Sequence, residues 1–436
     1  MTDNTVSAPV CADITRGSAF YRLVWKWHFL ASLYVLPFIF ILAITGGIYL
    51  FQPQIEEIIY RDRLNVVVTG AAQSLELQES AVRAAFPEAK IKDITTEGIA
   101  GRATVFTIQS ADRAKSYVWV NPYTSAILAS QTRDSTMMRM LKKFHGELLL
   151  GKIGTKFVEL SAHWAIVMLI TGIYMWWPRG QRSWGMAFKI PSAKGRAWWR
   201  ETHMFTGFLA FILILPLLLS GLPWTDIWGG GYKYVQTQAG QTSPSLRPGK
   251  DHTQSGQASG DSLAYQDVID IAVAQGMALP IVLLPPKDEM AVFYLQSGSN
   301  KRLDRSEIIV DQYSGVVLNR VDIAQFPFMA KLASYGIGFH QGQLYGTLNI
   351  IQNLVAAILG VVLAVSGFVA WWKRRPVGKL GVPATPDAML GWGMIVLVVV
   401  LAILLPLMGA SLVLALILDW VIFKRLGWFQ GAKLVE

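Results

Sequence analysis

The sequence predicts a mainly α-helical membrane protein with about six transmembrane helices, an internal duplication and two α+β modules outside the bilayer. Of its 436 residues, 53% are hydrophobic and only 16% are charged, which is too apolar for an ordinary soluble domain. Long charge-free runs and a repeated order of segments support the same fold class.

Five runs contain no Lys, Arg, Asp or Glu. A helix that spans the bilayer needs about 20 apolar residues. The first three each predict one span, and the fourth predicts one span after a polar lead-in. The fifth is interrupted by Pro406 and Gly409 and predicts a hairpin of two short spans. The expected segments are 27–52, 141–178 (with an interfacial part), 202–225, 331–372 (with an interfacial part) and the hairpin 388–423.

The basic residues predict the orientation of these spans. Arg179 to Arg200 holds six Lys or Arg and no acid, and further basic clusters follow later spans. By the positive-inside rule, segments 1–26, 179–201, 373–387 and 424–436 lie in the cytoplasm. Segments 53–140 and 226–330 then lie outside as two modules. The net charge of +10 is therefore read as a topology signal, not as nucleic-acid binding.

Cysteine usage restricts the chemistry of the outer modules. The single cysteine, Cys11, falls on the inner side. Structural disulfides and a cysteine-based metal or redox site are excluded.

The unit of one helix, one outer module and a second helix occurs twice. Trp25–Gly47 aligns without gaps on 200–222, so that His28 matches His203. The stretch "FHGELLLG" aligns on "FHQGQLYG", so that His145 matches His340. "VWVNPYTSAIL" and "IIVDQYSGVVL" each predict a β-hairpin, and "FTIQS" matches "FYLQS" just upstream. Such duplication usually places functional sites between the two halves.

Residues 237–262 are polar, rich in Gly and Ser and without periodicity, which predicts a flexible linker. His252 lies in this segment and is expected to be a solvated loop residue.

The other five histidines are the candidate functional residues: His28, His145, His163, His203 and His340. Ionisable side chains in or beside spans are rare and usually functional. A single histidine at a membrane border is more often an interfacial residue or a hydrogen-bond donor, but four of these five form two symmetry-matched pairs. We expect His28 and His203 at the inner border, and His145, His340 and His163 in the outer half.

The residue types around these histidines favour haem over a bare metal ion. Zinc or iron in an N/O site usually recruits carboxylates or thiols, and the spans hold only Glu159 and Asp419, near their ends. Imidazoles from facing helices in a dry, glycine-rich setting suit six-coordinate haem. Two haems, one per border, would carry electrons across the bilayer, and basic residues beside the inner pair could neutralise propionates.

The segment "FHGELLLGKIGTKFVELSAHWAIVMLITGIYMWWPRG" with "WKWHFLASLYVLPFIFILAITGGIYLF" before it resembles the PepSY-associated transmembrane family of bacterial inner-membrane proteins. The outer modules resemble PepSY domains. Members similar to this chain include iron-regulated proteins and FoxB-type siderophore reductases with two b-type haems. The resemblance implies haem b, axial ligands at His28, His145, His203 and His340, and reduction of a ferric siderophore or another Fe(III) chelate on the periplasmic side.

This chain departs from the repeat at His163, which has Ile358 as its counterpart. His163 is therefore a fifth candidate that could replace His145 or His340 at the outer haem. The electron donor is expected to be another molecule, cytoplasmic or in the membrane, because the sequence shows no nicotinamide or flavin motif. The alternative to a haem-dependent ferric-chelate reductase is a non-enzymatic regulator whose PepSY modules bind a periplasmic partner such as a protease.

Overall fold

The computed structural model describes residues 9–179, 184–249, 253–256, 260–382 and 391–421. The chain forms two compact units. Residues 1–46, 145–232 and 354–436 make up the first unit, and residues 47–144 and 233–353 make up the second.

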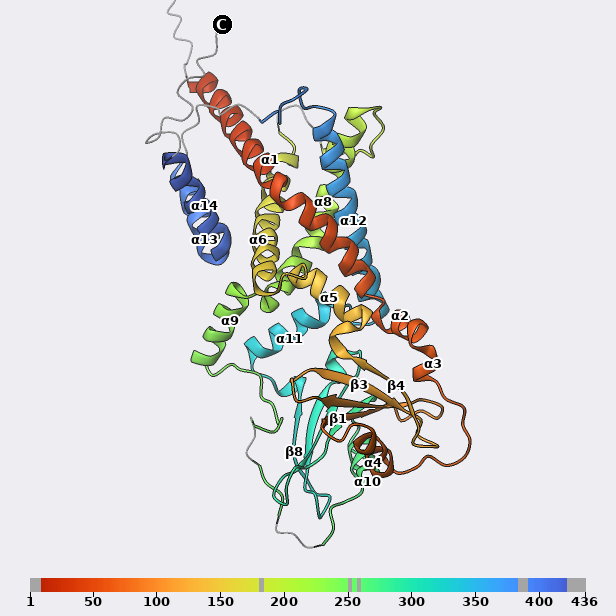
Figure 1. Cartoon of the computed structure of the whole chain (residues 1–436). Coiled ribbons are helices and arrows are strands. Elements are labelled where there is room, and N and C mark those ends of the chain that lie inside the picture. Colours follow the sequence, from red (N-terminus) through yellow and green to blue (C-terminus); the bar gives the residue numbers. More distant parts are fainter. Residues whose placement is uncertain (1–8, 180–183, 250–252, 257–259, 383–390, 422–436) are drawn as a thin grey trace, which may run out of the picture. The chain divides into compact units, whose positions relative to one another are not determined.

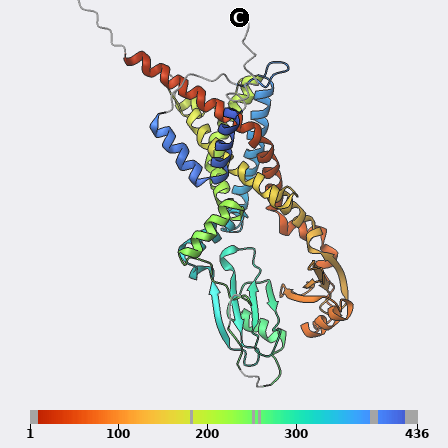
Figure 2. The same ribbon diagram turned by 60° about the vertical axis from the view of Figure 1, so that its left-hand side comes forward.

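Four helices dominate the first unit and lie side by side in both views (Figures 1 and 2). They are α1 (Pro9–Tyr49), α6 (Gly151–Trp176), α8 (Arg196–Gly221) and α12 (Thr347–Trp372). Each includes an apolar stretch of at least 26 residues, long enough to cross a bilayer. Leu169 of α6, Ala210 and Ile214 of α8, and Ala356 of α12 share one buried core. The chain is therefore a membrane protein with four long spans in the part that the structure describes.

The C-terminal apolar run forms a hairpin of two shorter helices, α13 (Trp392–Leu404) and α14 (Pro406–Asp419). With 13 and 14 residues, each is only about 20 Å long, against a hydrocarbon core of about 30 Å. The predicted hairpin of two short helices is present, and within the described residues four helices are long enough to cross the bilayer. A Cβ on Gly409 would lie 2.7 Å from the Ala402 carbonyl oxygen, so glycine is needed where the two helices meet.

The hairpin packs against α6 at its turn. Leu405 and Met408 are buried together with Ile166 of α6. The Trp164 indole nitrogen donates a hydrogen bond of 3.0 Å to Ser411 Oγ on α14.

One antiparallel sheet of eight strands forms the centre of the second unit, in the order β4-β3-β2-β1-β5-β6-β7-β8. The strands are β1 (Lys90–Thr96), β2 (Thr104–Gln109), β3 (Lys115–Val120), β4 (Ile127–Thr132), β5 (Ile281–Leu284), β6 (Phe293–Ser297), β7 (Ser306–Val310) and β8 (Val317–Asp322). Each repeat contributes four strands. The two predicted modules therefore share one sheet, which the sequence did not predict.

The two halves join where β1 pairs with β5, and Ile94 lies opposite Leu283. The ladders also show which strand positions are equivalent. Phe106 faces Val118 in one half, and Leu295 faces Ile308 in the other. Because Val118 and Ile308 match in the hairpin repeat, the equivalent of Phe106 is Leu295. The sequence alignment of "FTIQS" with "FYLQS" was therefore wrong by two residues. Because side chains alternate between the two faces of a strand, a shift of two residues still assigns each side chain to the correct face of the sheet.

Two helices cover one face of the sheet, α4 (Leu75–Ala85) and α10 (Tyr265–Ala274) (Figure 1). Val82 of α4 and Val268 of α10 are buried in the same core as Ile94, Phe106 and Leu283. One helix thus precedes the strands in each half.

The described part of the predicted linker lies partly against the sheet. Leu246 is buried with Tyr294 and Ile309, and its N–H donates to Glu307 Oε2 at 2.7 Å. Gly256 N–H donates to Asp311 Oδ2 at 2.6 Å. These contacts cover strands β6 and β7 on the face opposite α10.

Short helices connect the main elements. They are α2 (Gln52–Ile59), α3 (Arg61–Leu64), α5 (Met137–Glu147), α7 (Trp184–Ala187), α9 (Ile227–Gln238), α11 (Phe328–His340), and the 3₁₀ turns η1 (Arg133–Ser135), η2 (Leu222–Trp224), η3 (Arg302–Asp304) and η4 (Ile323–Gln325). Helix α5 ends just after His145 and α11 ends at His340. The matching "FH" stretches are therefore helix ends, each followed by a turn and then a span.

The joint between β1 and β5 gives a first testable prediction. Replacing Leu283 with Ala, at a fully buried position, should destabilise the second unit by about 2–5 kcal/mol, because the cavity lies in the shared core. Hydrogen–deuterium exchange of the intact protein should show lost protection in both halves of the sheet. Leu303→Ala, at a position 47% exposed, is the control. Loss of protection confined to β5–β8 would contradict a shared core.

Candidate functional site

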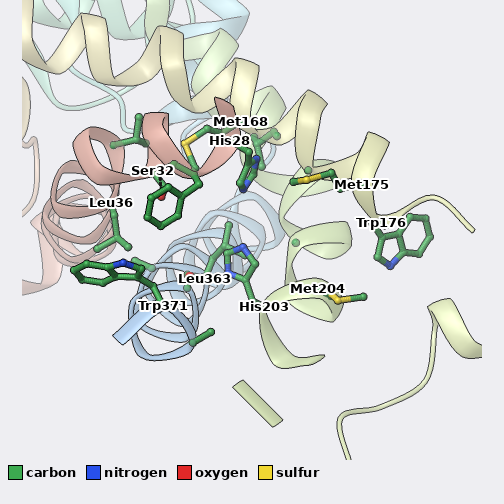
Figure 3. A pocket seen from close by; sticks show the side chains of 18 of the residues that line it. His28, Ser32, Leu36, Met168, Met175, Trp176, His203, Met204, Leu363 and Trp371 are labelled. Atoms are coloured by element: carbon green, nitrogen blue, oxygen red, sulfur yellow. Dashed lines mark hydrogen bonds between the residues drawn. The ribbon is translucent and has the colours of Figure 1, made fainter. Parts of the chain in front are cut away.

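A pocket of about 350 Å³ lies among α1, α6, α8 and α12 in the first unit. Its wall is mainly apolar, with Met168, Leu169 and Leu363 among the lining residues. His28 and His203 are its two histidines (Figure 3). A pocket of this size with a few convergent polar groups is typical of a ligand site.

His28 stands on α1 with one ring nitrogen held by α6. Its Nδ1 lies 3.0 Å from Thr171 Oγ1. The Thr171 hydroxyl donates its own proton to the Val167 carbonyl at 2.9 Å. With the hydroxyl proton directed to that carbonyl, the threonine oxygen accepts and Nδ1 of His28 carries the proton. A Cβ on the next residue, Gly172, would come within 3.5 Å of the His28 ring.

His203 stands on α8 and is held in the same way by α12. Its Nδ1 lies 3.1 Å from the carbonyl oxygen of Leu363, which can only accept. Ser366 Oγ is 3.5 Å from the same nitrogen. A Cβ on Gly367 would lie 3.1 Å from both Cε1 and Nδ1 of the ring. In both histidines Nδ1 is thus the protonated nitrogen, and Nε2 keeps a free lone pair.

The two rings point toward one another across the pocket (Figure 3), with centroids 6.4 Å apart and planes at 83°. Two imidazoles bonded through Nε2 to one metal ion, at about 2.0 Å each, would have centroids about 6.3 Å apart. The spacing of this pair therefore fits two axial ligands of one metal centre.

The pair alone does not complete a metal site. Among the residues that the structure describes, no three His, Cys, Asp or Glu side chains gather where they could hold a metal ion. A metal bound by His28 and His203 would take its remaining ligands from elsewhere. A porphyrin supplies four nitrogens in a plane and is itself apolar, so the residues present fit a haem.

Three arginines, Arg196, Arg200 and Arg374, also line the pocket. Burial and the neighbouring charge of Arg196 lower the pKa of the Arg374 guanidinium. Within the described ranges, none of the three forms an ion pair with a carboxylate. The pocket therefore combines an apolar interior with uncompensated positive charge, which suits an apolar ligand with acidic groups.

The outer candidates lie in different units. His145, in the first unit, has Nδ1 2.9 Å from Thr45 Oγ1, and a Cβ on Gly46 would lie 3.1 Å from its Cε1. His340, in the second unit, is the last residue of α11. Its carbonyl accepts a hydrogen bond of 3.2 Å from Asn353 Nδ2, which fixes the turn before α12.

His163 has a different environment. It is fully buried on α6, and neither ring nitrogen has a hydrogen-bond partner among the described residues. The nearest acidic atom, Glu159 Oε1, is 3.8 Å from Nε2. The Glu159 carboxylate accepts from the N–H groups of Ile227 and Trp228 at 2.9 and 2.7 Å, and so caps the start of α9. His252 lies outside the described residues.

Sequence reasoning found the histidines but missed their acceptors. Thr171 carries no distinctive pattern alone, and the Leu363 acceptor is a backbone carbonyl. One signal was available: a Ser or Thr followed by Gly occurs at corresponding places in the four spans, namely Thr45-Gly46, Thr171-Gly172, Ser220-Gly221 and Ser366-Gly367.

The fold and this pocket define a multi-span membrane protein with an apolar pocket between two histidines. The chain belongs to the PepSY-associated transmembrane family. Residues 25–374 match the family model described as the PepSY-associated TM region. The match includes most of α1, the other three long spans and the whole sheet, and ends before the C-terminal hairpin. Among curated proteins, none gives a significant match.

The Glu159 cap gives a second prediction. Glu159→Ala leaves two buried N–H groups unpaired and should lower the free energy of unfolding by about 1–3 kcal/mol per lost partner. Glu159→Gln keeps an acceptor and should cost less. Thermal unfolding in detergent checks the order of the two variants. Equal melting temperatures for Glu159→Ala and the unaltered protein would contradict the capping role.

Proposed function

We propose that the chain is a haem-dependent reductase of the bacterial inner membrane, which passes electrons across the bilayer to ferric iron in a periplasmic chelate such as a ferric siderophore. The observation that carries the proposal is the His28–His203 pair, with centroids 6.4 Å apart and a free Nε2 on each ring. Two imidazoles at this spacing fit shared ligation of one metal centre.

When bound, haem b supplies one-electron redox chemistry at its iron. The chain's own residues hold and tune it. His28 and His203 would be the axial ligands, and each Nδ1–H donor raises the basicity of its ring by bonding to Thr171 or to the Leu363 carbonyl. The apolar wall excludes water. Arg196, Arg200 and Arg374 would pair with the propionates.

A second haem on the periplasmic side is proposed from the repeat and the family resemblance, with His145 and His340 as the matching histidines. In this scheme an external donor, cytoplasmic or within the membrane, reduces the inner haem, and one electron reaches Fe(III) to give Fe(II). The cytoplasmic termini and periplasmic sheet follow from the positive-inside rule.

The haem proposal gives a third prediction. Protein expressed with a haem supply should show b-type bands in a reduced-minus-oxidised spectrum and hold two haems per chain. His203→Ala should lose one haem, because one axial ligand is removed. Met175→Leu, a change of similar volume in the same pocket wall, should keep both.

A second measurement tests the reaction itself. Chemically reduced protein mixed with a ferric chelate should be re-oxidised with formation of Fe(II), and His203→Ala should slow this step. Folded wild-type protein without b-type bands would end the proposal and favour the alternative, a regulator that binds a periplasmic partner through its sheet.

A further inference from the structure

Three histidines of the first unit lie in the same kind of seat, defined here as a Ser/Thr-Gly dipeptide on a neighbouring helix. His28 lies against Thr171-Gly172, His203 against Ser366-Gly367, and His145 against Thr45-Gly46. In each seat the glycine lets the ring approach the helix, and the Nδ1 acceptor belongs to the same turn.

The seat at His145 holds the same ring nitrogen as the other two seats. Thr45 Oγ1 lies 2.9 Å from Nδ1 of His145, and the hydroxyl proton has a second acceptor in the Ile41 carbonyl at 2.8 Å. His145 is therefore held through Nδ1, as His28 and His203 are. His163 has no such seat, since neither of its nitrogens has a hydrogen-bond partner in the described part of the chain.

We propose that the Ser/Thr-Gly seat positions haem-ligating histidines in this chain, and that it assigns His145, not His163, to the second haem. The inference rests on the proposed function and resolves the alternative that the sequence left open. The threonine is a positioning residue at His28 and His145, and the Leu363 carbonyl is the acceptor at His203. By accepting from Nδ1–H, the acceptor makes the imidazole a stronger donor to iron, which favours Fe(III) and lowers the reduction potential.

Redox titration of the purified holoprotein tests the seat. Thr45→Val removes the acceptor and should raise the midpoint potential of one haem. We expect a threefold to tenfold shift in the reduction equilibrium, tenfold being about 59 mV for one electron. Thr45→Ser should restore the wild-type potential. Thr155→Val, which removes a hydroxyl bonded to a carbonyl of its own helix, is the matched control and should change neither haem.

Haem counting tests the assignment. His145→Ala should lose one haem and His163→Gln should keep two. Gly46→Ala should perturb the second haem, whereas Gly146→Ala, with open space around its Cβ, should not. Two outcomes would overturn the proposed role of the seat and leave the reductase proposal standing. In the first, the wild type holds two haems but Thr45→Val leaves both potentials unchanged. In the second, only His163→Gln loses a haem. Wild type without haem would overturn both.

A second, independent feature lies in the second unit, where Arg302 and Arg305 stand together beside α11. Arg302 Nε donates to Ser334 Oγ at 3.0 Å, and Arg305 Nε donates to the Ser299 carbonyl at 2.7 Å. Gln343 Oε1 accepts from Arg305 at 3.2 Å. All these partners are neutral.

No carboxylate among the described residues lies within ion-pair distance of the two arginines. Within the described residues neither arginine makes an ion pair, whereas Arg102 lies 2.7 Å from Glu97 and Arg320 lies 2.9 Å from Asp322. Burial and the charge of Arg305 lower the pKa of Arg302 to about 10. A Cβ on Gly338 would lie 3.0 Å from Arg302 Cβ, so the helix is shaped around this side chain. Two half-buried cations held together by neutral groups favour an anion beside them.

We infer that Arg302 and Arg305 form a carboxylate-binding site. Helix α11, which lines the pair, ends at His340. The carboxylate could therefore come from a haem propionate or from a carboxylate-bearing ferric chelate.

Two measurements on the full-length protein distinguish these sources. Ga(III) citrate, which cannot be reduced in this way, is titrated calorimetrically, and haem per chain is counted. If the chelate is the source, Arg302→Gln and Arg305→Gln should each weaken Ga(III) citrate binding about tenfold with haem content unchanged. If a propionate is the source, both variants should lose one haem or show a shifted haem spectrum. Ga(III) citrate should then bind neither the wild type nor the variants.

Arg113→Gln is the control, because Arg113 is exposed and makes no ion pair among the described residues. It should match wild type in both measurements. Variants at Arg302 and Arg305 that match wild type in both would overturn the carboxylate site, and they would do so whether or not the chain reduces iron.

Discussion

The cost of burying an imidazole N–H in an apolar bundle explains how His28 and His203 are held in the first unit. Such a donor costs several kcal/mol when it is left without an acceptor. His28 and His203 meet this cost by donating from Nδ1 to α6 and α12. The consequence is chemical as well as structural. Once Nδ1 is committed to the neighbouring helix, only Nε2 remains to face the pocket, and its lone pair is that of a metal ligand.

The glycines of the spans serve the same arrangement. Helices come close wherever small residues allow it, so a glycine in a span usually means no more than tight packing. Here Gly172 and Gly367 are the residues against which the histidine rings lie. The backbone can approach the ring at these two glycines. The Thr171 hydroxyl and the Leu363 carbonyl then come within hydrogen-bond distance of Nδ1. Close packing and ligand orientation are therefore one feature.

A different constraint applies to the second unit, because the edge of a sheet exposes unpaired backbone N–H and C=O groups. A four-stranded half would expose β1 or β5 as an unpaired edge. Pairing these two strands removes both edges and unites two repeats over one core. The repeat that supplies matched histidines to the spans therefore also supplies matched strands to the sheet.

The sequence by itself determined the four long spans, the duplication, the hairpin after the last span and the set of histidines. Hydropathy, charge and repeats act over short stretches of chain and need no knowledge of distant contacts. Only the tertiary structure decided that the two modules share a sheet and that Glu159 caps α9. It also decided which nitrogen of His203 is free, because its acceptor is the backbone carbonyl of Leu363. Every residue has such a carbonyl, so only its position in space can distinguish it.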